Sequence, residues 1–423
     1  MILIYKIGER INKLSGIFSL FLYSISYLNV IYERRGWQLS FESLLILVII
    51  LSILEMIKNN QKYIFTLTLS IILLTQFEIG LFNLIPLVVL SFFLFHIRIC
   101  KRYLLVSLAA LILANSCLFM FDLRHNFLNS KYLLNYFSQN TKERVALNLP
   151  LAGNRLVYQA HNLIPNTLAR TLFPSSISNL AIQYANCPEY LLFKQSQIPP
   201  WLNILVISLI LYTLIYAWRN RKSHSDKTKI YLISALFFLI HFTAIAFYTY
   251  RFNGEMAEYY LIPTFVFFFI ITANILATLS KTRLRILIFI FLMMFGYINI
   301  STLFNSKNPY GFREKIQAIN FSLSIVKDNS FVLDSFQTCW YSGGYRYLYS
   351  LTGHEPLQSY MDQYLSEYYS PDNFSRPKFQ VVILTPELIG SNPEGYNEYR
   401  NEVISRAYRS GQFGAIEVYI VKI

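Results

Sequence analysis

Residues 259–279 read Tyr-Tyr-Leu-Ile-Pro-Thr-Phe-Val-Phe-Phe-Phe-Ile-Ile-Thr-Ala-Asn-Ile-Leu-Ala-Thr-Leu, a run without a single charged side chain. A helix that crosses the hydrocarbon core of a bilayer needs about 20 mostly apolar residues. The sequence therefore predicts a mainly α-helical, polytopic membrane helix bundle with about nine transmembrane helices. The other eight candidate spans lie near 14–32, 42–57, 62–77, 80–97, 102–121, 200–218, 229–250 and 284–303.

The composition excludes several soluble classes of protein. Of the 423 residues, 54% are hydrophobic and 14% are charged, whereas an ordinary soluble domain has about 25% charged residues. Glycine is scarce, so the composition does not favour an enzyme with a glycine-rich phosphate loop. The net charge of +14 does not indicate a nucleic-acid partner, because the basic residues lie mostly in short clusters between apolar runs. There they orient the spans and meet the lipid bilayer, which is the expected partner.

Basic residues are distributed unevenly among the short loops, and this bias sets the orientation of the spans. If the N-terminus is inside, the short outside loops hold only Arg34, Arg35 and Arg251. We therefore expect a cytoplasmic N-terminus, with residues 122–199 and the tail after about 304 outside. The inside segments hold sixteen Lys and Arg residues, namely Lys6, Arg10, Lys13, Lys58, Lys62, Arg98, Lys101, Arg102, Arg219, Arg221, Lys222, Lys227, Lys229, Lys281, Arg283 and Arg285.

The predicted spans lie within residues 1–121 and 200–303. Two regions, 122–199 and 304–423, lie outside them. The segment 122–199 is too polar to span and reads as a loop with short interfacial helices. It is either a structural cap or a lid over an outward-facing cavity. The tail, 304–423, reads as a small extracytoplasmic α/β domain. Its helices are expected at 313–327 and 397–409, and its strands at 331–334, 379–384 and 415–423.

The tail also contains an aromatic-rich stretch, 340–349, which is more typical of core packing than of a sugar-binding platform. The four cysteines have neither CxxC spacing nor nearby histidines, so neither a metal site nor a redox site is predicted. Cys187 and Cys339 share the expected outside compartment, and the sequence leaves their pairing open.

Three short stretches resemble a known family. They are Gly8-Glu9-Arg10 with the following span, which ends in Tyr32-Glu33-Arg34-Arg35-Gly36-Trp37; Phe121-Asp122-Leu123-Arg124-His125-Asn126-Phe127; and Ala257-Glu258-Tyr259-Tyr260-Leu261-Ile262-Pro263. In this order, and followed by an α/β unit, they resemble the integral-membrane glycosyltransferases with a GT-C fold. The nearest likeness is to family 39-like enzymes, such as dolichyl-phosphate-mannose protein mannosyltransferases and aminoarabinose transferases. Those enzymes take sugar from a polyprenyl-phosphate carrier.

The chain departs from this family at its start. The family opens with a span, an extracytoplasmic loop that carries an acidic catalytic residue, and a return span. This chain goes straight into what looks like the family's third span, so a shortened N-terminus without that first catalytic loop is expected. The family's catalytic acid has no counterpart here, and Glu33, Glu42 and Asp122 are the weak candidates that remain.

Sugar transfer from a lipid phosphate needs a base for the acceptor hydroxyl, cationic groups or a metal for the leaving phosphate, and an apolar groove for the lipid. Arg34, Arg35 and Arg124 are the candidates for the donor phosphate, because a guanidinium donates paired hydrogen bonds to anionic oxygens. Tyr259 and Tyr260 are the candidates to line the donor groove. A divalent metal is compatible with this chemistry, but no set of metal ligands is predicted.

Each candidate also has a structural interpretation. Arg34 and Arg35 would anchor to lipid headgroups, and Glu33 and Glu42 would be salt-bridge partners rather than metal ligands. Asp122 would cap the start of the long loop. The two tyrosines would belong to the aromatic belt that any membrane protein has at its interfaces.

The resemblance implies a glycosyltransferase that moves a sugar from a polyprenyl-phosphate-linked donor to a glycan, lipid or protein acceptor. Transfer would take place at the extracytoplasmic face, in a bacterial inner membrane. The alternative is a non-catalytic or truncated relative that acts as the partner of another membrane glycosyltransferase. A lipid-linked glycan transporter is less favoured, because hardly any charge lies within the spans.

Overall fold

The computed structural model divides the chain into two compact units. The first comprises Met1–Pro174 and Ile198–Leu303, and the second Ser175–Gln197 and Phe304–Ile423. The first unit is helical and the second contains a small mixed sheet. The residues that the structure describes are 1–34, 38–77, 82–138, 163–174, 199–252, 258–305, 310–336, 344–361, 373, 375–386 and 393–423.

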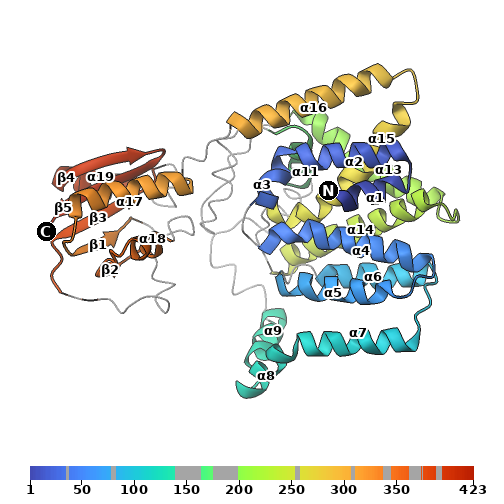
Figure 1. The fold of residues 1–423 in the computed structure, drawn as a ribbon, viewed down its shortest axis with the longest axis horizontal. Helices are drawn as coiled ribbons and strands as arrows, with labels where there is room; N and C mark the ends of the chain where they lie inside the picture. The colour runs from blue at the N-terminus through green and yellow to red at the C-terminus, as the bar shows by residue number, and fades with distance from the viewer. Residues whose placement is uncertain are drawn as a thin grey trace. The chain divides into compact units, whose positions relative to one another are not determined.

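Helices and short 3-10 turns make up the first unit (Figure 1). Their bounds are α1 (Ile2–Glu9), α2 (Lys13–Ile25), α3 (Tyr27–Arg34), η1 (Gln38–Phe41), α4 (Glu42–Ile57), α5 (Tyr63–Phe77), α6 (Leu84–Leu94), α7 (Lys101–Ala114), α8 (Ser116–Arg124), α9 (Leu128–Ser138), α11 (Ile164–Leu172), α13 (Pro200–Arg219), α14 (Asp226–Phe252), η5 (Glu258–Leu261), α15 (Ile262–Leu279) and α16 (Arg285–Asn305).

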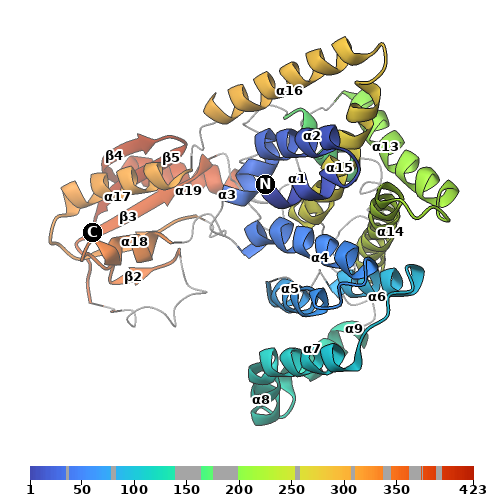
Figure 2. The ribbon, with the colours of Figure 1, turned by 45° about the vertical axis from the view of Figure 1, so that its right-hand side comes forward.

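Helix α15 lies at the centre of this unit, with α1, α2, α4 and α14 packed around it (Figures 1 and 2). In the most apolar 18-residue stretch of Tyr259–Leu279, 89% of the residues are buried, whereas the corresponding stretches of α13 and α16 are each 22% buried. A helix that is apolar on all sides is expected in such a core. The outer helices instead expose apolar side chains, such as Ile204 and Ile286, to their surroundings. Exposed apolar faces of this extent suit contact with lipid, as expected of a membrane protein.

The prediction of nine spans is not confirmed. Among the described residues, α13, α14, α15 and α16 are each long and apolar enough to cross a membrane. Two further candidates are bent pairs, α2 with α3 at 64° and α7 with α8 at 46°, which brings the total to between four and six. Helices α4, α5 and α6 have 16, 15 and 11 residues, fewer than the roughly 20 that a span needs. The predicted spans at 42–57 and 62–77 have nearly the same bounds as α4 and α5, whereas the one at 80–97 is longer than α6.

Polar contacts join the ends of several helices to one another. Arg10 pairs with Glu55 across a short contact, and Lys58 pairs with Asp226 at 3.4 Å. The backbone N–H of Cys100 donates to the Gln61 side chain at 3.0 Å. The alternating topology predicted from the sequence assigns all these segments to a single end of the bundle.

The second unit contains α17 (Phe312–Val326), β1 (Phe331–Asp334), α18 (Tyr345–Leu351), β2 (Gln358–Ser359), β3 (Phe379–Leu384), α19 (Pro393–Arg406), β4 (Ala407–Phe413) and β5 (Ile416–Lys422). Its sheet has the strand order β2-β1-β3-β5-β4. Strand β1 is parallel to β2 and to β3, whereas β5 runs antiparallel to β3 and to β4.

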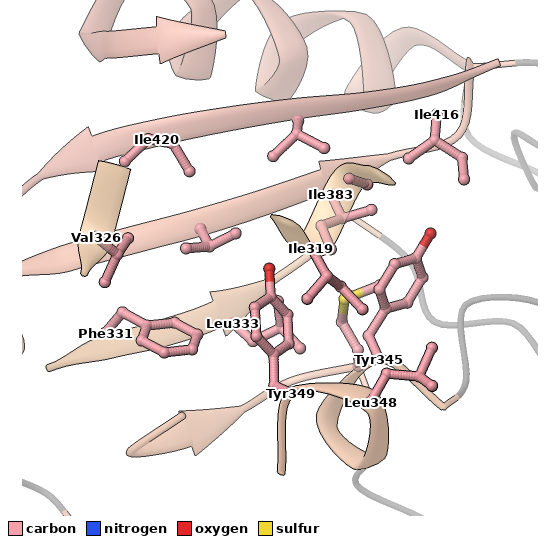
Figure 3. Packing of buried hydrophobic residues seen from close by; sticks show 14 residues of the cluster. Ile319, Val326, Phe331, Leu333, Tyr345, Leu348, Tyr349, Ile383, Ile416 and Ile420 are labelled. Carbon is pink, nitrogen blue, oxygen red and sulfur yellow. The ribbon is translucent and has the colours of Figure 1, made fainter. Parts of the chain in front are cut away.

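Both faces of this sheet are covered, because successive side chains of a strand point to opposite sides. Val381 and Ile383 join the core under α17 and α18, whereas Val382 and Leu384 join the core under α19. Figure 3 shows the first core, to which α17 contributes Ile319 and Val326 and α18 contributes Tyr345, Leu348 and Tyr349.

The sequence predicted much of this unit. The strands at 331–334 and 379–384 coincide with β1 and β3, and α17 and β5 lie within one residue of their predicted ends. The predicted end of the helix at 397–409 was wrong, because α19 ends at Arg406 and β4 begins at Ala407. Strand β4 is a polar edge strand and lacks the alternating apolar pattern that identifies half-buried strands.

Two tyrosines of the aromatic stretch at 340–349 are core residues, in agreement with the packing interpretation. Tyr345 is 1% exposed and Tyr349 is 0% exposed. Residues 340–343 lie outside the described residues, as do Cys187 and Cys339, so their predicted roles stay predictions.

Helices α1 and α2 pack at a distance that depends on two glycines. A Cβ atom on Gly8 would come within 2.8 Å of Ser19 Oγ and 2.9 Å of the Gly16 Cα. We expect Gly8→Ala to destabilise the protein by about 1–3 kcal/mol, because the opposing atoms include backbone that cannot move aside. Gly296→Ala is the control, since its nearest neighbour is the Phe21 ring at 3.3 Å. Thermal unfolding in detergent measures both, and equal effects would contradict the close approach.

In the second unit, Arg400 binds Glu417 through two hydrogen bonds of 2.7 and 2.8 Å, and Tyr419 donates to the same carboxylate at 2.9 Å. Burial by itself raises the pKa of Glu417, but the bonds from Arg400 and Tyr419 together hold that pKa below its ordinary value. A carboxyl with a depressed folded pKa stabilises the fold above its unfolded pKa of about 4.3. This stability is lost as the pH falls through the folded pKa.

We therefore expect Glu417→Gln to lower the free energy of unfolding by about 1–2 kcal/mol at pH 7. The difference from the unsubstituted protein should shrink as the pH falls below about 4. Chemical denaturation, monitored by pulsed hydrogen exchange in peptides that cover β5, measures this free energy of unfolding. The control is Glu402→Gln, which removes an exposed pair with Arg406 and should cost less than about 0.5 kcal/mol. A loss that does not depend on pH would contradict the ionic contribution.

Candidate functional site

The candidate site depends on a break between α2 and α3. Helix α2 ends at Ile25 and α3 begins at Tyr27, with the two axes bent by 64°. A break leaves backbone groups without their helical partners, and in a buried apolar setting each such group must be satisfied. The Tyr27 N–H donates to Asn299 Oδ1 at 2.8 Å, and the Ser26 hydroxyl donates to the Thr171 carbonyl at 2.7 Å.

Asn299 connects the break to two further helices. Its amide nitrogen donates to the carbonyl of Leu172, at the end of α11, and to that of Phe295, in α16, each at 2.9 Å. The Asn299 side chain is fully buried. The side-chain amide of Asn299 thus connects the start of α3, the end of α11 and the body of α16.

Helix α11 belongs to the segment for which the sequence predicted short interfacial helices. Seven of its nine residues are buried, and it contacts α3, η5, α13 and α15. This part of the 122–199 segment is therefore packed into the helical unit. One of its buried residues is Arg170, which is 5% exposed. Sequence reasoning did not select Arg170, although an arginine inside the apolar stretch Leu168–Leu172 is a signal that could have identified it.

Several predicted site residues lie on elements that pack against α11 or α15. Helix α3 contacts η1 and α11, while η5 contacts α11 and α15. Glu33 and Arg34 lie at the end of α3, Glu42 begins α4 directly after η1, and Tyr259 and Tyr260 form η5. We name these five residues the end cluster. Arg35, the other predicted phosphate ligand of this region, lies outside the described residues.

Glu33 is half-buried and is held against the bundle. Its carboxylate accepts a short hydrogen bond from the hydroxyl of Tyr23. Tyr23 is 2% exposed and contacts Phe269 of α15 edge-on at 5.9 Å. Its carbonyl accepts from the Asn29 side chain at 3.0 Å. The packed core therefore fixes one oxygen of Glu33 through a single rigid side chain.

Glu42 and Arg34, the other charged residues of the end cluster, differ in exposure. Glu42 is 2% exposed and is the first residue of α4, where a negative charge interacts favourably with the helix dipole. Its burial leaves it poorly placed to contact an acceptor from solution. Arg34, in contrast, is exposed at the end of α3, as a residue that binds a ligand phosphate must be.

The structure does not bring Asp122 or Arg124 to the end cluster. Both lie on α8, which together with α7 and α9 forms one edge of the first unit in both views (Figures 1 and 2). Asp122 accepts from the backbone N–H groups of Asn129 and Ser130 at 2.7 and 3.1 Å. These are first-turn donors of α9, so Asp122 caps that helix, in agreement with its structural interpretation. Arg124 is exposed on the same helix.

Metal ligands do not gather at this end of the unit. Within the described part of the chain, no group of three His, Cys, Asp or Glu side chains lies close enough to hold a metal ion. The chemistry available in the end cluster is that of one fixed carboxylate, one exposed guanidinium and two half-buried phenols.

We expect Asn299→Leu to loosen α3 and α11 together. The substitution leaves the Tyr27 N–H and the Leu172 carbonyl without the partner they have now, at a cost of about 2–4 kcal/mol. Hydrogen exchange should accelerate in both 27–34 and 164–172. Ser24→Ala is the control, because among the described residues the Ser24 hydroxyl bonds within its own turn, to the Phe21 carbonyl. Faster exchange in one helix alone would show that Asn299 does not couple them.

The family-like stretches separate in space. The described parts of the first and third contain Glu33, Arg34, Tyr259 and Tyr260, whereas Asp122 and Arg124 of the second lie on α8. Comparisons with protein-family models, curated proteins and solved structures find no match to this chain. The resemblance to GT-C glycosyltransferases therefore rests on the short stretches themselves and stays an expectation.

Proposed function

We propose that this protein is a membrane glycosyltransferase that moves a sugar from a polyprenyl-phosphate-linked donor to an acceptor at the extracytoplasmic face. A bacterial inner membrane is its proposed location. The observation that carries the proposal is the end cluster, whose carboxylate, exposed arginine and two tyrosines lie on elements that each pack against α11 and α15. This combination matches the three requirements of the chemistry, namely a base, a cation and an apolar surface.

Glu33 is the proposed general base. Its carboxylate takes the proton of the acceptor hydroxyl while the acceptor oxygen bonds to the anomeric carbon of the sugar. The bond from that carbon to the phosphate oxygen breaks, and the polyprenyl phosphate leaves with the electron pair. Because Tyr23 fixes one carboxylate oxygen, the other can face the acceptor without a large loss of side-chain freedom.

Arginines are suited to hold the leaving phosphate. Arg34 follows Glu33 directly and is exposed, so its guanidinium can donate two parallel hydrogen bonds to phosphate oxygens. Arg170 places a second positive charge on α11, the helix that contacts both α3 and η5, and at 5% exposure it would act on the phosphate through space and not by contact. Positive charge near the phosphate stabilises the charge that develops on the leaving group.

The prenyl chain needs an apolar surface next to these groups. Helix α13 begins beside α11, where the Asn203 side chain donates to Asn166 at 2.6 Å. On the first turns of α13, Trp201 and Ile204 are 60% and 64% exposed. An isoprenoid lying along these side chains would stay in the apolar phase while its phosphate reaches the end cluster.

The alternative function, a non-catalytic partner of another membrane glycosyltransferase, also has an observation in its favour. Glu33 is engaged by Tyr23, and Glu42 is 2% exposed. If neither carboxylate can take a proton from an acceptor, the end cluster would serve only to bind the donor or to hold the helices together.

A transfer assay separates the two functions. The purified full chain in lipid nanodiscs is given polyprenyl-phosphate hexoses and pentoses, with bacterial membrane glycolipids as acceptors, and release of polyprenyl phosphate is measured. We expect Glu33→Gln to lower the rate about 100-fold or more, since a base is lost while the shape is kept. Asp122→Asn should leave the rate near that of the unsubstituted protein. Donor binding without turnover would favour the non-catalytic partner.

A further inference from the structure

A histidine lies in the middle of α14, within one of the candidate spans. His241 is 4% exposed and is surrounded by apolar residues such as Phe237 and Phe242. An ionisable side chain at such a position is costly and usually has a function. No metal-binding group forms around it among the described residues.

Both ring nitrogens of His241 have partners. Nε2 lies 3.0 Å from the carbonyl oxygen of Tyr260, and Nδ1 lies 2.7 Å from the amide nitrogen of Asn83. A carbonyl oxygen only accepts, so Nε2 carries the proton, and Nδ1 accepts from the Asn83 amide. This pattern corresponds to the neutral imidazole, because an imidazolium would direct two N–H groups outward and clash with the Asn83 donor.

Aromatic stacking fixes the plane of the ring. His241 stacks on Phe237 with centroids 5.0 Å apart and planes at 16°. Phe237 stacks in turn on Phe267 of α15 at 4.2 Å and 17°. The imidazole is therefore held by a column of two rings, Phe237 of α14 and Phe267 of the central helix α15, and by one hydrogen bond on each side. It joins α14 to the turn before α6 and to η5.

The bond to Tyr260 connects this buried residue to the end cluster. Turn η5 consists of only four residues, Glu258–Leu261, and the rings of Tyr259 and Tyr260 lie 4.5 Å apart. Fixing the Tyr260 carbonyl fixes the backbone that presents both rings, next to α11 and the start of α15.

We propose that His241 is a positioning residue for the donor site. As a neutral, Nε2-protonated imidazole it locks η5 so that Tyr259 and Tyr260 are held ready for the polyprenyl-phosphate donor. This inference rests on the proposed function. His241 touches no reacting atom, and its effect should therefore fall on donor binding rather than on the chemical step.

Two substitutions isolate the hydrogen bond to Tyr260. His241→Phe keeps a ring that stacks on Phe237 but removes both bonds, whereas His241→Gln keeps an N–H donor that reaches the Tyr260 carbonyl. In the nanodisc assay we expect His241→Phe to raise the donor KM about tenfold with kcat nearly unchanged, as expected when donor binding is weakened but the chemical step is not. His241→Gln should stay within about threefold of the unsubstituted protein. His224→Phe, at an exposed position between α13 and α14, is the matched control.

A second readout tests the geometry without any substrate. Nitrogen-15 NMR of the full chain labelled at histidine should show one neutral Nε2–H imidazole that keeps its tautomer between pH 5 and pH 8. Hydrogen exchange in η5 should accelerate in His241→Phe and not in His241→Gln. These two measurements distinguish a locked turn from a general loss of stability, which would accelerate exchange in α14 and α15 as well.

The outcomes separate the two proposals. If the unsubstituted protein neither binds nor turns over any donor, the proposed function is overturned. If it turns over donor and His241→Phe leaves the donor KM unchanged, the positioning role alone is overturned. An Nδ1–H tautomer would also overturn it, because the Tyr260 carbonyl would then face a nitrogen without a proton.

Discussion

A backbone N–H inside an apolar bundle must find an acceptor, and the Tyr27 N–H finds one on Asn299. This constraint makes the break between α2 and α3 tolerable, since the cost of an unsatisfied buried amide would otherwise oppose it. The same amide side chain also holds the end of α11, at Leu172. The direction of α3, the docking of α11 and the attachment of α16 therefore depend on one fully buried asparagine, and so does the position of Glu33.

Elsewhere in the helical unit, buried polar side chains satisfy one another in the same way. Asn274 of α15 donates to the Tyr231 hydroxyl at 2.6 Å and accepts from Ser15 at 3.3 Å, while His241 binds Asn83 and the Tyr260 carbonyl. Each bond joins two different elements, and the paired residues are between 19 and 259 positions apart in the sequence. In a core where most contacts are apolar and non-directional, such bonds select one arrangement of the helices.

The chemistry-bearing residues are found at helix ends for a related reason. A charge is costly inside an apolar bundle unless it is paired, so exposed arginine and half-buried carboxylate are confined to the boundary. The end of α3 provides such a boundary, where Glu33 is fixed by the core through Tyr23. Asp122 also lies at a helix end, but there it is used to cap α9. Similar residues at two helix ends thus have different roles.

The sequence by itself determined the properties that depend on composition and periodicity. It predicted the membrane character, the helical unit followed by an α/β unit, and strands β1 and β3, because solvent avoidance and residue alternation are local properties of the chain. Only the tertiary structure decided that the helix breaks at Ser26, that α11 with Arg170 is buried, and that Asp122 lies apart from Glu33. These features depend on which groups distant in sequence meet, and hydropathy carries no information about such partners. The count of nine spans is not confirmed, because α4, α5 and α6 are shorter than the roughly 20 residues that a span needs.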